Sequence, residues 1–221
     1  MASRRNQPKS KFSRPPDVHH RDNLEERKLF LLIVEGDTEE KYFQHFRIST
    51  GRNITNITNC GKKSSKSKLV NIAIKQRVKY REQGHYDDDT DETWVVFDRD
   101  KDIQNQKDRD SFNQALELAK NNHIEVAYSN DSFELWFLLH FKDVSSEMDR
   151  NEIDAKLRKH LPRYQHGNDV FDNINLYYPK AVERSKKLLE DATNNGLLPA
   201  DANPSTKVHL LTEKLIAQQR S

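Results

Sequence analysis

Residues 29–43 read Leu-Phe-Leu-Leu-Ile-Val-Glu-Gly-Asp-Thr-Glu-Glu-Lys-Tyr-Phe, and the rest of the fold can be worked out from this stretch. Its apolar run ends at Val34, and a short apolar run that stops at a turn signal is typical of a buried strand. Gly36 permits a tight turn, and Asp37 with Glu40 fits a helix cap and its capping-box partner. The pattern predicts a strand, a turn and a helix, with Glu35 at the carboxyl end of the strand, where α/β sheets place their active crevices.

A second apolar run, residues 94–97, ends in Asp98-Arg99-Asp100. Side chains alternate along an extended chain, so Asp98 and Asp100 point the same way. If the two strands are parallel neighbours, as βαβ connections require, Glu35, Asp98 and Asp100 converge at one edge of the sheet. Carboxylates packed so closely repel one another unless a hard cation joins them, and oxygen ligands suit Mg²⁺ or Mn²⁺. The sequence therefore predicts a divalent-metal site built from these three acids.

The remaining patterns predict an α/β protein with a central, mostly parallel four-stranded sheet flanked by helices. Two further strands are expected at residues 53–58, near an edge, and at residues 124–128. From residue 147 the spacing of apolar residues is helical, and Asn203-Pro204 fits a cap followed by proline at the first helical position. We therefore expect a flexible basic tail at residues 1–27, an α/β domain at 28–145, and a helical C-terminal subdomain at 146–221 that packs on the sheet.

Composition narrows the class of protein. A net charge of only +2 favours no particular partner, and the single cysteine excludes an intramolecular disulfide and a multi-cysteine zinc site. One cysteine also fits a reducing compartment. The chain has no apolar run of about 18 residues, and its N-terminus is too charged for a signal peptide. These features predict a cytoplasmic protein that does not enter a membrane.

The most basic part of the folded chain follows the second predicted strand. Residues 62–81 contain no acidic residue and eight basic ones. A helix with a basic face can follow the phosphates of a nucleic acid, and the alternative is an ordinary solvated face of a highly charged protein. The candidate nucleic-acid contacts are Lys62, Lys63, Lys66 and Lys68.

A nearly all-apolar segment, residues 133–141, predicts a buried helix. Glu134 stands in its first turn. It fits either the partner of a helix cap at Asp131 or a further acid near the metal site. His140, in the same helix, is expected to be a hydrogen-bonded core histidine rather than a ligand.

Three motifs resemble known proteins: residues 33–43, residues 97–100, and residues 129–141, which read Ser-Asn-Asp-Ser-Phe-Glu-Leu-Trp-Phe-Leu-Leu-His-Phe. Glu-Gly after one strand and Asp-x-Asp after a later one resembles the Toprim domain of topoisomerases, primases and OLD-type nucleases. Together the three motifs look like the RloB/AbiLii family, Toprim-like proteins associated with restriction and abortive-infection loci. The resemblance implies a Toprim-like (Rossmann-like) fold. It also favours Glu134 as a fourth metal ligand. The loop Tyr164-Gln165-His166-Gly167 departs from the family pattern, in which a lysine closely follows the tyrosine.

The resemblance implies a Mg²⁺- or Mn²⁺-dependent nuclease in antiviral defence, acting on RNA or DNA, with a further protein of the restriction or defence system as an expected partner. Asp98 and Asp100 would hold the metal, and Glu35 would be a ligand or the general acid/base, the role of the matching glutamate in Toprim enzymes. One alternative is a non-catalytic module that binds nucleic acid or nucleotide and acts through a partner effector. Another is structural, with the acids forming salt bridges to Arg99 and the basic helix.

Overall fold

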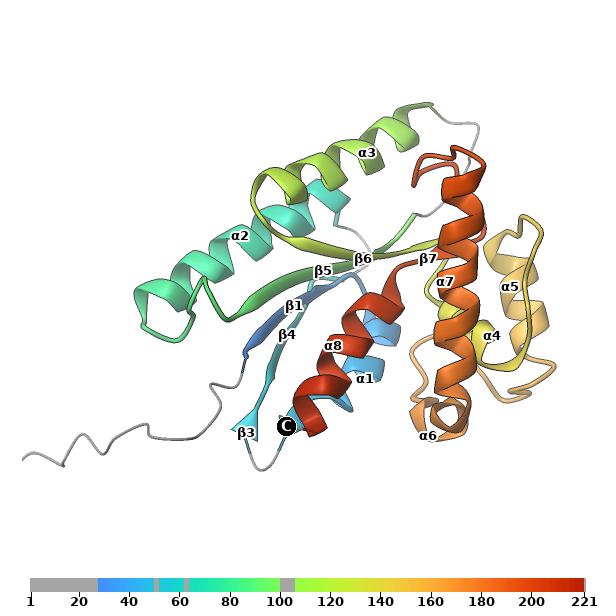
Figure 1. Cartoon of the computed structure of the whole chain (residues 1–221), viewed down its shortest axis with the longest axis horizontal. Helices are drawn as coiled ribbons and strands as arrows, with labels where there is room; N and C mark the ends of the chain where they lie inside the picture. Colours follow the sequence, from blue (N-terminus) through green and yellow to red (C-terminus); the bar gives the residue numbers. More distant parts are fainter. Residues whose placement is uncertain (1–27, 50–51, 62–63, 100–105, 221) are drawn as a thin grey trace, which may run out of the picture.

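A five-stranded sheet with the order β4-β1-β5-β6-β7 forms the centre of the protein (Figure 1). The computed structural model describes residues 28–49, 52–61, 64–99 and 106–220. Four strands are parallel: β1 (Phe30–Val34), β4 (Thr55–Asn59), β5 (Glu92–Asp98) and β6 (Glu125–Asn130). The expected mostly parallel sheet is confirmed, and the strand expected near an edge at residues 53–58 is β4, which is an edge strand with slightly different bounds.

The expected number of strands was wrong. A fifth strand, β7 (Ser205–Thr206), runs antiparallel to β6 and pairs through Ser129↔Thr206 and Asn130↔Ser205. It has only two residues, so it carries no alternating apolar pattern of its own. Because Ser205 and Thr206 are in this strand, Pro204 is not at the first position of the following helix, which begins at Val208.

Helices cover both faces of the sheet (Figure 1). On one face lie α2 (Lys66–Glu82) and α3 (Gln106–Asn121), and on the other α1 (Asp37–Gln44) and α8 (Val208–Arg220). The remaining helices are α4 (Glu134–Phe141), α5 (Arg150–Leu157), α6 (Phe171–Ile174), the 3₁₀ turn η1 (Asn175–Tyr177) and α7 (Tyr178–Asn194). A small separate ribbon pairs β2 (Ile48–Ser49) with β3 (Arg52–Asn53).

The central strands are apolar throughout because both faces are covered. Leu32 and Trp94 are paired in register and belong to the core under α1, α4 and α8. Ile33 and Val95, the next pair, belong to the core under α2 and α3. The alternation fixes the register of β1 against β5, since a slip of one residue would exchange the two cores.

The C-terminal helices share a core with the sheet. Leu135 of α4, Ile153 of α5 and Leu211 of α8 are fully buried in the same cluster as Leu32 of β1. The predicted helical region that packs on the sheet is therefore present. The division at residue 145/146 stays a prediction, and the predicted tail at residues 1–27 lies outside the described residues.

The expected capping box at the start of α1 is wrong. Gly36 is the N-cap and makes no side-chain cap bond, and Asp37 is the first helical residue. The carboxylates of Asp37 and Glu40 instead accept hydrogen bonds from Asn59 Nδ2 at 2.7 and 2.8 Å. Asn59 ends the neighbouring strand β4, so a partner distant in sequence replaces the local one.

Candidate functional site

Glu35 lies directly after β1 and is buried. Its Oε2 accepts a hydrogen bond from the backbone N–H of Asp98 at 3.3 Å. Both of its carboxylate oxygens also lie 3.1 Å from Lys66 Nζ. Lys66 is the first residue of α2, which is capped by Ser65 through the Lys68 amide. The capped start of α2 therefore places an ammonium group against the acid at the end of β1.

Asp98 is the last residue of the neighbouring strand β5, and its Oδ2 accepts a hydrogen bond from Arg150 Nη2 at 2.8 Å. Arg150 opens α5, whose start is fixed by a capping box between Asp149 and Glu152. The backbone N–H of Arg150 donates to Asp131 Oδ2 at 2.9 Å. Since Asp131 follows β6, Arg150 joins the ends of two adjacent strands.

The sheet brings Glu35 and Asp98 to the same edge, although their basic partners come from opposite layers. Lys66 belongs to the α2 layer and Arg150 to the layer of α4 and α5. Asp100, the third predicted acid, lies outside the described residues. Oxygen donors from Glu35 and Asp98 fit a hard divalent cation, but such an ion would compete with the two basic side chains for them.

Glu134, at the start of α4, is 2% exposed and takes part in a second cluster. Its Oε1 accepts hydrogen bonds from Tyr164 Oη at 2.8 Å and from His166 Nδ1 at 2.7 Å. The other ring nitrogen of His166 lies 2.9 Å from Asp154 Oδ2. The interpretation of Glu134 as the partner of a cap at Asp131 is wrong, because Phe133 is the N-cap and Asp131 binds Arg150.

This second cluster could hold a metal ion. One ligand atom each from Glu134, Asp154 and His166 lies within 4.8 Å of the others. The loop that carries His166 is attached to the start of α1, since the Gly167 N–H donates to Thr38 Oγ1 at 3.1 Å. The cluster therefore lies beside the helix that follows Glu35.

Burial and hydrogen bonding have opposite effects on the pKa of Glu134. Burial alone would raise the pKa of Glu134, but hydrogen bonds from His166 and Tyr164 outweigh it and hold that pKa below its usual value. The hydrogen bond to Glu134 raises the pKa of His166, while burial and the nearby charge of Glu134 raise the pKa of Tyr164. Glu134 is thus ionised at neutral pH, and Tyr164 keeps its proton and donates it.

The predicted nucleic-acid contacts have different surroundings. Lys66 is mostly buried against Glu35, and Lys68 is exposed two residues further along α2. Lys62 and Lys63 lie outside the described residues. Arg99, the partner in the structural alternative, is buried, donates to the Ala200 carbonyl at 3.3 Å and lies over the ring of Phe112. A nucleic-acid role for these lysines stays a prediction.

Two buried histidines belong to the core. His140 is 2% exposed, and its Nδ1 donates to the Trp136 carbonyl at 2.8 Å, which confirms the expected core histidine. His209 Nδ1 lies 2.7 Å from Ser185 Oγ, and Ser185 in turn donates to the Thr206 carbonyl. Ser185 is fully buried and its only proton is already used, so this Ser–His pair stabilises α7 and α8 rather than forming an exposed nucleophile.

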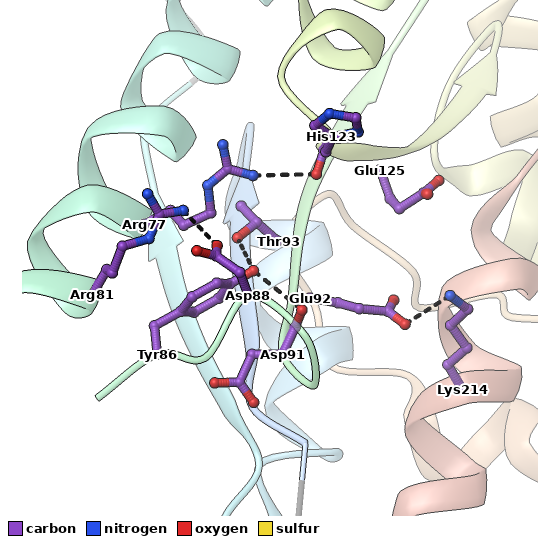
Figure 2. Close-up of a pocket in the computed structure, with 10 residues that line it drawn as sticks. All are labelled: Arg77, Arg81, Tyr86, Asp88, Asp91, Glu92, Thr93, His123, Glu125 and Lys214. Atoms are coloured by element: carbon purple, nitrogen blue, oxygen red, sulfur yellow. Dashed lines mark hydrogen bonds and ion pairs between the residues drawn. The ribbon is translucent and has the colours of Figure 1, made fainter. Parts of the chain in front are cut away.

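A polar cavity of about 460 Å³ lies at the opposite end of the strands from Glu35 and Asp98, where β5 and β6 begin (Figure 2). Arg81 pairs with Asp88, Glu92 with Lys214, and Arg77 donates to the His123 carbonyl. The cavity is lined by Arg77, Arg81, Tyr86, Asp88, Asp91, Glu92, Thr93, His123, Glu125 and Lys214. It contains none of the predicted site residues.

Sequence reasoning missed the partners that surround the acids: Arg150, Asp154, Tyr164 and His166. The Asp149–Glu152 capping box could have predicted the start of α5, and so the position of Arg150 on it. His166 lies in the 164–167 loop, which is unusual in sequence but had no role assigned to it. Asp154 and His166 are twelve residues apart with no local motif, so only the folded loop reveals their contact.

Comparison with known proteins identifies the family. The model of the family described as RloB-like protein matches residues 30–215, which is most of the chain and includes all three motifs. Neither the curated proteins nor the solved structures include a match to the chain. Among the described residues, no helix combines the length and the apolar character needed to cross a membrane. The extent of the family match establishes that the chain belongs to the RloB-like protein family.

Proposed function

We propose that this protein hydrolyses phosphodiester bonds of RNA or DNA in the cytoplasm as part of antiviral defence, using Mg²⁺ or Mn²⁺ at the carboxyl edge of its sheet. The observation that carries the proposal is the 3.3 Å contact between the Asp98 amide and Glu35 Oε2. It brings one acid from each of two neighbouring parallel strands to the edge where α/β folds bind ligands. Family membership supports the same site through the matching motifs.

The residues that would hold the cation are Glu35, Asp98 and Asp100. Glu134, the fourth ligand expected from the sequence, instead contacts Tyr164 and His166 in the second cluster. A divalent ion bound there supplies a Lewis acid for a phosphoryl oxygen and lowers the pKa of bound water. Glu35 acts as a ligand or as the proton acceptor beside it. Lys66, 3.1 Å from both Glu35 oxygens, orients that carboxylate and brings positive charge to the edge where a phosphate would lie.

The basic helix supports a nucleic acid as the substrate. α2 starts at this edge, Lys68 in its first turn is exposed, and its last turn carries Lys79 and Arg81. Backbone phosphates are attracted by such a charge distribution without regard to sequence. A second protein from the restriction or defence system is the proposed partner that would direct this activity.

The alternative function is a non-catalytic module that binds nucleic acid or nucleotide and acts through a partner effector. One observation favours a non-catalytic role, and it equally favours the structural alternative in which the acids form salt bridges with the basic helix. Glu35 is paired with Lys66 and Asp98 with Arg150, so each of the two acids already has a basic partner from the protein. A site balanced in this way binds a divalent cation less strongly than one with surplus negative charge.

Incubation of the purified chain with labelled tRNA, single-stranded RNA and plasmid DNA, in Mg²⁺ and in Mn²⁺, separates the two functions. We expect cleavage by the wild-type protein, reduced by about 10²–10⁴-fold in Glu35→Gln and in Asp98→Asn, because one acid/base group alone contributes about that factor. Asp100→Asn should show a loss of the same order.

Glu125→Gln is the matched control, because it removes an exposed carboxylate at the opposite edge of the sheet. It should cleave like the wild type. Wild-type rates in all three site variants would refute the assignment. Tight binding without cleavage under every condition would establish the alternative.

A further inference from the structure

Glu134, Asp154 and His166 carry too much negative charge for the partners that they have. Two carboxylates bring two negative charges, and one imidazolium supplies at most one positive charge. Among the described residues, neither Glu134 nor Asp154 pairs with a lysine or arginine, and their side-chain contacts are His166 and Tyr164. Both side chains are largely removed from water, at 3% and 15% exposure. Uncompensated carboxylates in such surroundings are costly unless a cation joins them.

A second observation points to the same place. Asp154 Oδ1 is buried and has no hydrogen-bond partner among the described residues, although Oδ2 of the same carboxylate contacts His166. A buried acceptor normally has a partner. A metal ion beside Asp154 would supply one.

The three side chains lie close enough to share one ion if the imidazole turns one ring nitrogen toward it. The ring of His166 now bridges the two carboxylates, at 2.7 Å from Glu134 and 2.9 Å from Asp154. Atoms that share one tetrahedral zinc ion at about 2.0–2.2 Å lie about 3.3–3.6 Å apart. The ligand atoms here all lie within 4.8 Å of one another, so side-chain movements of about 1 Å would bring them to that spacing. If a divalent ion replaced the protons that His166 shares with the two carboxylates, the imidazole would be neutral. The two negative charges would then be balanced by the two positive charges of the ion.

We propose that Glu134, Asp154 and His166 bind a divalent transition-metal ion of the zinc class, distinct from the Mg²⁺ or Mn²⁺ proposed at Glu35 and Asp98. Imidazole is a ligand suited to zinc and its neighbours, whereas sites built from oxygen alone suit Mg²⁺. Three protein ligands leave a coordination position open. The ion would tie α4, α5 and the 164–167 loop together, and this loop contacts the start of α1.

The test is calorimetric titration of the chelator-treated full-length protein with Zn²⁺ in excess Mg²⁺, repeated with Co²⁺ and its visible absorption. We expect one tight Zn²⁺ equivalent in the wild type. His166→Gln and Asp154→Asn should each bind at least tenfold more weakly and lose the Co²⁺ band, since even indirect partners of a metal contribute about 10–100-fold in affinity. Circular dichroism checks that both variants fold. If one of them does not fold, the other alone is enough to test the site.

Two controls make the result specific. His160→Gln replaces an exposed histidine stacked on Phe141, outside the cluster, and should bind Zn²⁺ like the wild type. Glu35→Gln should also keep Zn²⁺ binding, so the zinc site and the proposed nuclease site can fail separately. Absence of Zn²⁺ binding by the wild type, or unchanged affinity in His166→Gln and Asp154→Asn, would overturn the proposal.

Discussion

His140 should make the protein less stable as the pH falls, by an amount that the structure predicts. Its imidazole is 2% exposed, donates through Nδ1 to the Trp136 carbonyl, and has Arg184 nearby. Burial is the main reason that its pKa falls to about 4, and the charge of Arg184 lowers it further. A cationic ring at this place would be buried beside a second cation.

The folded protein takes up a proton at His140 less readily than the unfolded chain, so acid destabilises the fold. The folded pKa of about 4 lies below the ordinary value of 6.5, so the unfolded chain takes up the proton first and stability is lost as the pH falls below 6.5. The loss attributable to His140 reaches about 2 kcal/mol at pH 5 and approaches about 3 kcal/mol below pH 4, at 1.36 kcal/mol per pKa unit. Above pH 7 the contribution vanishes.

The perturbation is His140→Asn, because the asparagine amide can still donate to the Trp136 carbonyl and does not titrate. Urea unfolding near pH 7.5 and near pH 5 gives the free energy of unfolding of both proteins. The variant should be the less stable protein near pH 7.5, since it leaves space in a packed core. Its deficit should shrink by about 2 kcal/mol near pH 5.

His160→Asn controls for the replacement of an imidazole at the surface. An equal difference in the free energy of unfolding between wild type and His140→Asn at both pH values would contradict this prediction. That outcome would mean that His140 can be protonated in the folded protein, and it would reopen the possibility that the residue is a ligand.

Two more predictions follow from the acidic clusters. Lys66→Met should lower the free energy of unfolding, measured with urea, by about 3–5 kcal/mol, because it leaves Glu35 charged and buried without this partner. If a cation binds at Glu35, added Mg²⁺ should restore part of the lost stability. Tyr164→Phe should cost about 1–3 kcal/mol by removing a hydrogen-bond donor from the buried carboxylate of Glu134, whereas an unchanged melting temperature would show that the bond contributes little.

The sequence was sufficient to predict the parts of the fold that depend on long apolar runs. β1 and β5 are buried on both faces, and such strands show as continuous runs that end at the acids. β7 was missed because two residues carry no periodicity, and because its pairing with Ser129 and Asn130 connects positions more than seventy residues apart. Only the completed fold brings those segments together.

Local motifs failed where a distant partner was available. Asp37 and Asp131 both fitted helix caps by spacing, yet Asn59 binds the first and the Arg150 amide binds the second. A cap contributes about 1 kcal/mol, so a hydrogen bond formed by tertiary packing can replace it at little cost. Capping patterns therefore predicted where these helices start to within a few residues, but not what the carboxylates do.

The two acidic clusters differ in how their charge is balanced, and this difference predicts the order in which ions bind. At the strand ends, Glu35 and Asp98 have Lys66 and Arg150, so a cation must compete with two basic side chains. At Glu134 and Asp154 the only basic partner among the described residues is His166. A transition-metal ion should therefore bind the second cluster at lower concentration than Mg²⁺ binds the first. If nucleic acid draws Lys66 or Arg150 away from its carboxylate, Mg²⁺ affinity at the strand ends should rise when substrate is present, which would couple metal binding to the encounter with nucleic acid.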